Sequence, residues 1–201
     1  MNRNKGSRQE RSRPLMLLVG FLLCVGTVTA SGDPDRIDYE LLATNRTSTM
    51  EKEMNQAAAR GFRLAAVMGG DTSFGGSEVV VIMQKGRESA SGSYQYKLLA
   101  TNRTSTMEKE MNQAAGEGFE HAGQTVFETT FGGKETVVIM ERDGAGEARY
   151  EYKLLATKRT STLQKELTLE GENGFKLAGM TVSRTTFGGE ELVSILQRPA
   201  R

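Results

Sequence analysis

Apolar and polar positions follow one pattern along the chain, and that pattern occurs three times. In the segment YEYKLLAT, Tyr152 and Leu154 share a face with alternating spacing, which is typical of a half-buried strand. The next segment places apolar residues such as Met50 and Met54 at helical spacing. A Gly-Phe step then leads into a second apolar run, and a Gly-Gly pair separates it from a third. The pattern predicts the order strand, helix, strand, strand.

The three copies are related by direct repetition of sequence. Leu41–Ala58 recurs without change at Leu98–Ala115, and a diverged copy begins at Leu154. Repetition at a fixed period is the signature of a tandem repeat protein. Short stretches rich in glycine, serine and acidic residues separate the copies and indicate linkers. We therefore expect repeats at residues 37–85, 94–142 and 150–198.

The last strand of each repeat is apolar on both faces. Val79–Met83 reads Val-Val-Val-Ile-Met, whereas a strand with one solvated face would alternate. A unit of this size buries only about 60% of its unfolded surface, and one short helix cannot cover both faces of a sheet. We expect an α+β fold in which each repeat forms a mostly antiparallel three-stranded sheet with one helix. The repeats should pack sheet to sheet, or edge to edge, into one pseudo-symmetric body.

Local signals mark both ends of each predicted helix. Ser48 precedes Glu51 by three residues, which is the spacing of a capping box. Ser105 with Glu108 repeats it, and the third copy has Gln in the acidic position. Glycines able to adopt positive φ are expected to end the helices: Gly61, Gly118 and Gly174.

Residues 1–30 have the composition of a cleaved secretory signal. Basic residues precede the apolar stretch Leu15–Val28, and Val28 and Ala30 provide small side chains at the spacing of a cleavage site. The prediction is a secreted or periplasmic protein with no stable membrane span after cleavage. The alternative is an uncleaved N-terminal anchor, although a membrane helix needs about 20 apolar residues.

Composition narrows the possible chemistry. The chain has 26 Lys and Arg against 25 Asp and Glu, a net charge of +1, one Cys and one His. This balance argues against nucleic-acid binding, and the single Cys and His exclude a disulfide framework and Cys or multi-His metal centres. No cofactor and no catalytic residues are predicted. His121 takes the position of Leu64 and Leu177 in the other copies and is interpreted as a tolerated substitution.

The candidate ligand-binding residues lie at two places in each repeat. Arg, Thr and Ser at the helix start combine a guanidinium, hydroxyls and free backbone N–H groups, which suit a phosphate, sulfate or carboxylate. The alternative is that Ser caps the helix and Arg is merely solvated. A Phe before each Gly-Gly pair could hold an apolar ligand or partner, or could pack on its own sheet. The two sets are Arg46, Thr47, Ser48, Arg103, Thr104, Ser105, Arg159, Thr160 and Ser161, and Phe74, Phe131 and Phe187.

The third copy carries motifs that resemble a known family. It has Tyr-Glu-Tyr-Lys from Tyr150, then Gly-Phe-Lys-Leu-Ala at 174–178 and a closing Leu-Gln-Arg. This is similar to a family of small bacterial domains of unknown function, whose pattern runs Tyr-x-Tyr-Lys, a helix, Gly-Trp-Glu-Leu-Val and a terminal strand. Here Phe175 stands where that family often has Trp. The resemblance covers each repeat and implies no activity.

These observations predict an exported, non-enzymatic binding or interaction module, whose partner is a small anion, a glycan or a protein. One alternative is a small-molecule enzyme or carrier with a pocket between repeats, which should show Asp, Glu or His with shifted pKa values in one cleft. The other is a purely structural envelope protein that assembles through open sheet edges.

Overall fold

The computed structural model describes residues 36–72, 76–86, 94–128, 134–144, 149–184 and 189–200. Residues 33–201 belong to one compact unit. The predicted leader lies outside the described residues, as do Phe74, Phe131 and Phe187. Among the helices that are described, none is long and apolar enough to cross a membrane.

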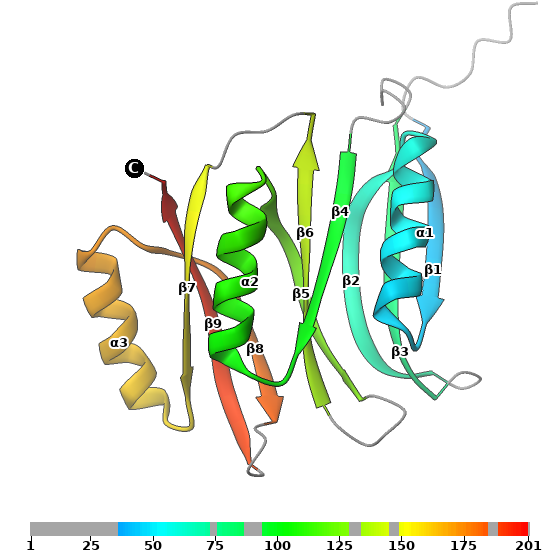
Figure 1. Ribbon diagram of the computed structural model, residues 1–201. Helices are drawn as coiled ribbons and strands as arrows, with labels where there is room; N and C mark the ends of the chain where they lie inside the picture. The colour runs from blue at the N-terminus through cyan, green and yellow to red at the C-terminus, as the bar shows by residue number, and fades with distance from the viewer. Residues whose placement is uncertain are drawn as a thin grey trace, which may run out of the picture. The chain divides into compact units, whose positions relative to one another are not determined.

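The order strand, helix, strand, strand is confirmed in each repeat (Figure 1). The first repeat comprises β1 (Asp38–Thr44), α1 (Thr47–Ala59), β2 (Arg63–Thr72) and β3 (Gly76–Lys85). The second comprises β4 (Tyr94–Thr101), α2 (Thr104–Gly116), β5 (Glu120–Glu128) and β6 (Lys134–Asp143). The third comprises β7 (Tyr150–Thr157), α3 (Thr160–Glu172), β8 (Lys176–Arg184) and β9 (Glu190–Pro199).

Each repeat forms its own antiparallel sheet, which confirms the α+β class. The strand orders are β1-β3-β2, β4-β6-β5 and β7-β9-β8, so the last strand of each repeat is central. In the first sheet Ile82 of β3 faces Leu41 on one side and Ala66 on the other. The second strand of every repeat contains a register shift near its start. Because the last strand is central, the first strand of each repeat lies at an edge of its sheet.

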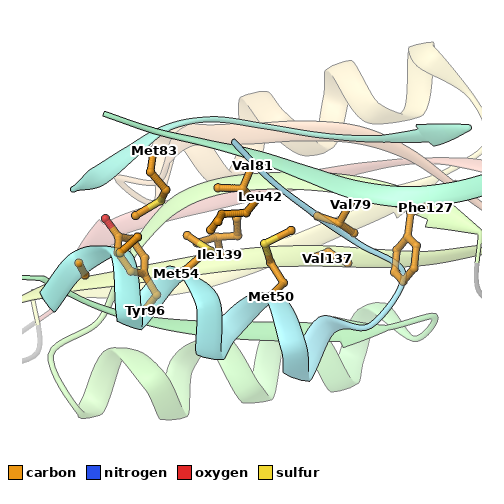
Figure 2. Close-up of a cluster of buried hydrophobic side chains, with 12 residues drawn as sticks. Leu42, Met50, Met54, Val79, Val81, Met83, Tyr96, Phe127, Val137 and Ile139 are labelled. Carbon is orange, nitrogen blue, oxygen red and sulfur yellow. The ribbon is translucent and has the colours of Figure 1, made fainter. Parts of the chain in front are cut away.

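Helix α1 lies between its own sheet and the sheet of the next repeat. Met50 and Met54 are fully buried in a cluster that contains Val81 of β3 and also Tyr96 and Ile139 of the second repeat. Figure 2 shows both methionine side chains pointing from α1 into this cluster. The packing differs from the sheet-to-sheet contact expected from the sequence, because the helix is inserted between the sheets on one side. The two sheets also meet directly there, through β5, which contacts both β2 and β3 of the first repeat.

The central strand of the second repeat is covered on both faces. Val137, Val138, Ile139 and Met140 are all 0% exposed. The first and third of these pack in the cluster with α1, and the other two pack in the cluster with α2. The doubly apolar strand is thus explained by burial between two helices, one from each of two repeats.

The outward face of the first sheet has no such cover within the described residues. In β3 the burial alternates: Val79, Val81 and Met83 are buried, whereas Val80 and Ile82 are only half-buried. The expectation that both faces are sheltered therefore holds for the second repeat and fails for the first.

The helix ends match the prediction, but the helix starts do not. Gly61, Gly118 and Gly174 have φ of 90°, 84° and 84°. The predicted capping box is wrong: Arg46 occupies the N-cap, and its side chain makes no capping hydrogen bond. Ser48 lies inside the first turn, and the Glu51 carboxylate accepts a hydrogen bond from the backbone N–H of Leu98, in the next repeat. The same N-cap arrangement occurs at Arg103 and Arg159.

Two glycines are explained by the direct contact between β2 and β5. A Cβ at Gly69 would lie 2.3 Å from the carbonyl oxygen of Val126, and one at Gly123 would lie 2.9 Å from a methyl group of Val67. Both distances are too short for any side chain, so the two strands can approach this closely only because glycine occupies each position.

Candidate functional site: helix-start loops, repeat joints and end faces

The helix-start loops have the same local geometry in all three repeats. The last residue of the preceding strand is Thr44, and its hydroxyl accepts a hydrogen bond from the backbone N–H of Arg46 at 3.2 Å. Thr101 and Thr157 accept in the same way from Arg103 and Arg159, at 3.2 and 3.3 Å. Each arginine is extended and exposed. In Figure 1 the three helix starts lie at the same end of their repeats, with strands between them.

The predicted loop residues differ in their exposure but share one electrostatic property. Arg46, Arg103, Arg159 and the three serines are exposed, and Thr47 and Thr104 are half-buried. Most other described arginines form ion pairs, as Arg60 does with Glu40. In the described part of the chain no carboxylate pairs with the three loop arginines. The positive charge of the loops is therefore available to solvent.

A small cavity adjoins one of the three loops. It measures about 10 Å³ and is bounded by Arg103 and Thr104 of the second repeat together with Leu154 and Ser183 of the third. A space of this size accommodates about one water molecule. The cavity is therefore too small for a phosphate or sulfate, and an anion would have to bind on the open surface of the loop.

The contact between successive repeats is a repeated structure of its own, which we call a joint. In the first joint, Asn55 of α1 donates its amide to the carbonyl of Tyr96 at 2.9 Å and accepts from the N–H of Tyr96 at 2.9 Å. Glu51 accepts from the N–H of Leu98 at 2.8 Å. These side chains satisfy the outward backbone groups of edge strand β4, which would otherwise be open to pairing.

The second joint reproduces these bonds one repeat later. Asn112 of α2 donates to the carbonyl of Tyr152 at 2.8 Å and accepts from its N–H at 2.9 Å. Glu108 accepts from the N–H of Leu154 at 2.8 Å. A further bond between buried hydroxyls, from Thr136 to Ser183 at 3.0 Å, has no counterpart with the same residue types in the first joint.

At each joint the hydroxyl of a buried tyrosine forms a hydrogen bond with the second strand of the preceding repeat. The hydroxyl of Tyr96 accepts from the N–H of Leu64 at 2.8 Å and donates to Glu141 at 2.8 Å. Burial raises the pKa of Tyr96 well above its ordinary value, and the Glu141 carboxylate adds to the increase. Burial likewise raises the pKa of Tyr152 to about 12. Both hydroxyls remain neutral across the physiological range and act as hydrogen-bonding groups.

His121 belongs to the second joint. Its backbone N–H donates to the hydroxyl of Tyr152 at 2.7 Å, and its ring Nε2 lies 2.7 Å from the amide oxygen of Gln124. Burial lowers the pKa of the imidazole, and the hydrogen bond with Gln124 opposes this only in part. The environment therefore favours the neutral ring, which bonds within the joint.

Two open grooves lie beside the joints; the sequence offered a pocket between repeats only as an alternative and did not identify the residues that line it. The groove at the first joint is about 440 Å³, and the one at the second is about 370 Å³. The charges in the second groove are paired internally, because Lys153 contacts Glu170 at 2.6 Å and Arg198 contacts Glu151 at 2.7 Å. Each groove contains the asparagine and tyrosine of its joint together with the Phe after the helix, Phe119 or Phe175. No signal in the sequence would have revealed them without knowledge of how the repeats meet.

Exposed apolar side chains collect at the two ends of the repeat series. The outward face of the first sheet, which we call the front face, exposes Ile37, Tyr39, Leu41 and Met68 by 47 to 65%. The outward side of β8, which we call the rear face, exposes Leu177, Met180 and Val182 by 50 to 55%. Leu169 on α3 is the remaining large exposed apolar residue of the described chain. None of the eight belongs to the described part of the second repeat.

Comparison with family models, curated proteins and solved structures gives no match. The resemblance to the bacterial domain family thus stays a prediction, and the function is inferred from the geometry alone. Among the residues that the structure describes, no group of three or more His, Cys, Asp or Glu is placed to hold a metal ion.

Proposed function

We propose that the chain is an exported, non-enzymatic binding module that attaches to a macromolecular partner through its two end faces. The observation that carries the proposal is the segregation of exposed apolar side chains. Leu41 is 65% exposed, whereas Leu98, at the same position in the second repeat, packs against the cluster at the first joint. Contiguous exposed apolar surface is typical of interaction sites.

The ionisable groups support binding rather than catalysis. The shifted pKa values of Tyr96, Tyr152 and His121 arise from burial at the joints. Each of the three bonds to groups that hold one repeat against the next. Their perturbation thus has a structural cause, whereas an active site would need such groups to face a substrate.

Site-specific photo-crosslinking in the cells that produce the protein tests this proposal. A photoreactive amino acid at position 41 or 177 should give covalent adducts with a macromolecule. Position 169 is a matched control, because Leu169 is 56% exposed and lies on neither end face. Adduct yields at 41 and 177 no greater than the yield at 169 would contradict the proposal.

A second candidate function is anion binding at the helix-start loops. It is favoured by the exposed, unpaired guanidinium groups of Arg46, Arg103 and Arg159 at helix N-termini, where backbone N–H groups favour negative charge. The repetition of the loop would give three equivalent sites of low individual affinity.

Thermal shift measurements in phosphate and sulfate, against chloride at equal ionic strength, test the second candidate. Replacing the three loop arginines with alanine should abolish the anion-specific rise in melting temperature. The matched control replaces Lys52, Lys109 and Lys165, which are exposed at equivalent positions on the helices, and should retain the rise. If both triple variants respond alike, the loops are not anion sites.

A further inference from the structure

We propose that the partner of the front face is the rear face of a second copy of this chain, so that copies associate head to tail. The inference rests on the proposed function, because it takes both end faces as docking surfaces. It adds the identity of the occupant, which is the chain itself.

The first argument is that the chain already makes this contact twice. At each joint a face bearing a tyrosine and a leucine of an edge strand receives the helix and second strand of the preceding repeat. The receiving residues are Tyr96 and Leu98 at the first joint and Tyr152 and Leu154 at the second. The front face presents Tyr39 and Leu41 at the same positions of β1. It therefore has the composition of a receiving face, but no helix among the described residues docks on it.

The second argument concerns the backbone of the edge strand. At the joints, asparagine and glutamate side chains bond to the outward groups of the edge strand, as Asn55 does at Tyr96. Within the described ranges no side chain bonds to the corresponding groups of Tyr39 and Leu41 in β1. An edge strand with free outward groups and an apolar face is suited to pairing with another chain.

The third argument is the composition of the rear face. Its residues Leu177 and Met180 correspond to His121 and Gln124, which bond to the third repeat at the second joint, and Val182 corresponds to Val126. Two of the three positions are thus more apolar in the repeat that no later repeat of this chain covers. Leucine and methionine exposed by 55 and 53% are suited to burial against another apolar face.

The contact between copies must be weaker than the joints, because its polar anchors are altered. On α3 the positions of Glu51 and Asn55 are held by Gln164 and Thr168, and these bond to each other at 3.4 Å. At the second joint Glu120 and Arg149 form an ion pair at 3.1 Å. The equivalent positions at the contact between copies hold Lys176 and Arg36, which are both positively charged. We therefore expect an association that forms at high protein concentration and reverses on dilution.

The two faces are different surfaces, so the contact is heterologous. Every added copy presents a new front face or rear face, and growth is open-ended unless the copies close into a ring. An association through two identical front faces would instead stop at a dimer.

Sedimentation velocity and light scattering on the purified, processed chain over a range of concentrations test the inference. The mass of the native protein should rise beyond that of a dimer. Leu41→Arg on the front face and Leu177→Arg on the rear face should each abolish the rise. Leu169→Arg should not, because Leu169 lies on the side of its helix where the equivalent residues Gln56 and Gln113 stay exposed at the two joints.

A mixture of the two face variants gives the decisive result. Leu41→Arg retains an intact rear face and Leu177→Arg retains an intact front face, so an equimolar mixture should form a complex of one copy each and grow no further. A native protein that stays monomeric, a mixture that stays monomeric, or association blocked by Leu41→Arg alone would overturn the inference. In those cases crosslinks from positions 41 and 177 to a different macromolecule would leave the proposed function standing, and their absence would remove it too.

Discussion

At the scale of single residues, buried hydroxyl groups distinguish the repeats from one another. Ser194 is 0% exposed on the central strand β9, on the side that faces α3 together with Leu196. Its hydroxyl has no hydrogen-bond partner among the described residues. The first and second repeats have Val81 and Val138 at the same position, and both are fully buried. Ser194 thus leaves a polar atom unsatisfied in an otherwise apolar layer.

We expect Ser194→Val to raise the free energy of unfolding by about 1 kcal/mol, because an unsatisfied buried hydroxyl is replaced by a side chain of similar shape. Urea denaturation followed by circular dichroism would measure the change. Thr136→Val is the matched control. The Thr136 hydroxyl donates to Ser183, so its removal should lower the free energy of unfolding by a similar amount. A destabilised Ser194→Val variant would contradict the assignment.

The burial of His121 leads us to expect that the free energy of unfolding depends on pH. Burial holds its pKa below the ordinary value of 6.5, so the unfolded chain binds a proton more readily than the folded chain. The free energy of unfolding should therefore fall as the pH drops below about 6.5. Thermal melts between pH 5 and 8 would show this. His121→Leu, which introduces the residue of the other repeats, should remove that component and leave the slope due to carboxylates.

At the scale of elements, the sequence predicted what each segment is and which side it buries. The predictions that Met50 and Met54 form the buried stripe of the helix and that a glycine ends it are both confirmed. The capping box failed for a physical reason. A glutamate three residues after a serine can bond backwards to that serine as a cap or sideways to another strand, and the spacing is the same in both cases. Glu51 bonds sideways to Leu98, which the local sequence does not encode.

Asn55 and Asn112 should be the most important polar residues of the helices. Asn55→Ala removes two hydrogen bonds to the backbone of edge strand β4. We expect the free energy of unfolding to fall by about 1 to 3 kcal/mol, because buried backbone groups lose their partners. Asn112→Ala should have the same effect at the second joint. Thr168→Ala, at the equivalent exposed position of α3, should change stability by less than about 0.5 kcal/mol. Equal effects at all three positions in chemical denaturation would contradict the role of the joints.

At the scale of the whole molecule, the sequence could not show how the repeats meet. The apolar strand Val79–Met83 indicated that a second face needs cover, but the pattern does not say what covers it. In the second repeat this face of the central strand is covered by a helix of the preceding repeat. No described helix covers the first repeat in this way, and its front face is therefore exposed. The strand orders were equally hidden, because an apolar strand is compatible with any position in a sheet. Among the predicted site residues, the loop arginines are exposed and unpaired as a binding site requires, while their ligand remains a proposal.

The third repeat should not be stable alone. Residues Tyr152, Val193 and Ile195 are buried in a cluster with Met107 and Met111 of α2. In a fragment of residues 150–198 these side chains would face water, and we expect no cooperative melting transition. Differential scanning calorimetry would test this against the full chain. A cooperatively melting monomeric fragment would show that each repeat is self-sufficient.

The arrangement of the second repeat has a consequence for how such a chain can be lengthened. Both of its faces are joint faces: one receives α1, and the other is covered by its own helix, which in turn docks on the third repeat. A duplicate of residues 94–149 inserted after itself would therefore find a matching neighbour on each side, without any new substitution. Proteins with one or two additional middle units should fold, and their unfolding enthalpy should grow in proportion to the number of units. Appending units behind α3 would not have this property, since Gln164 and Thr168 no longer provide the bonds that the next edge strand needs.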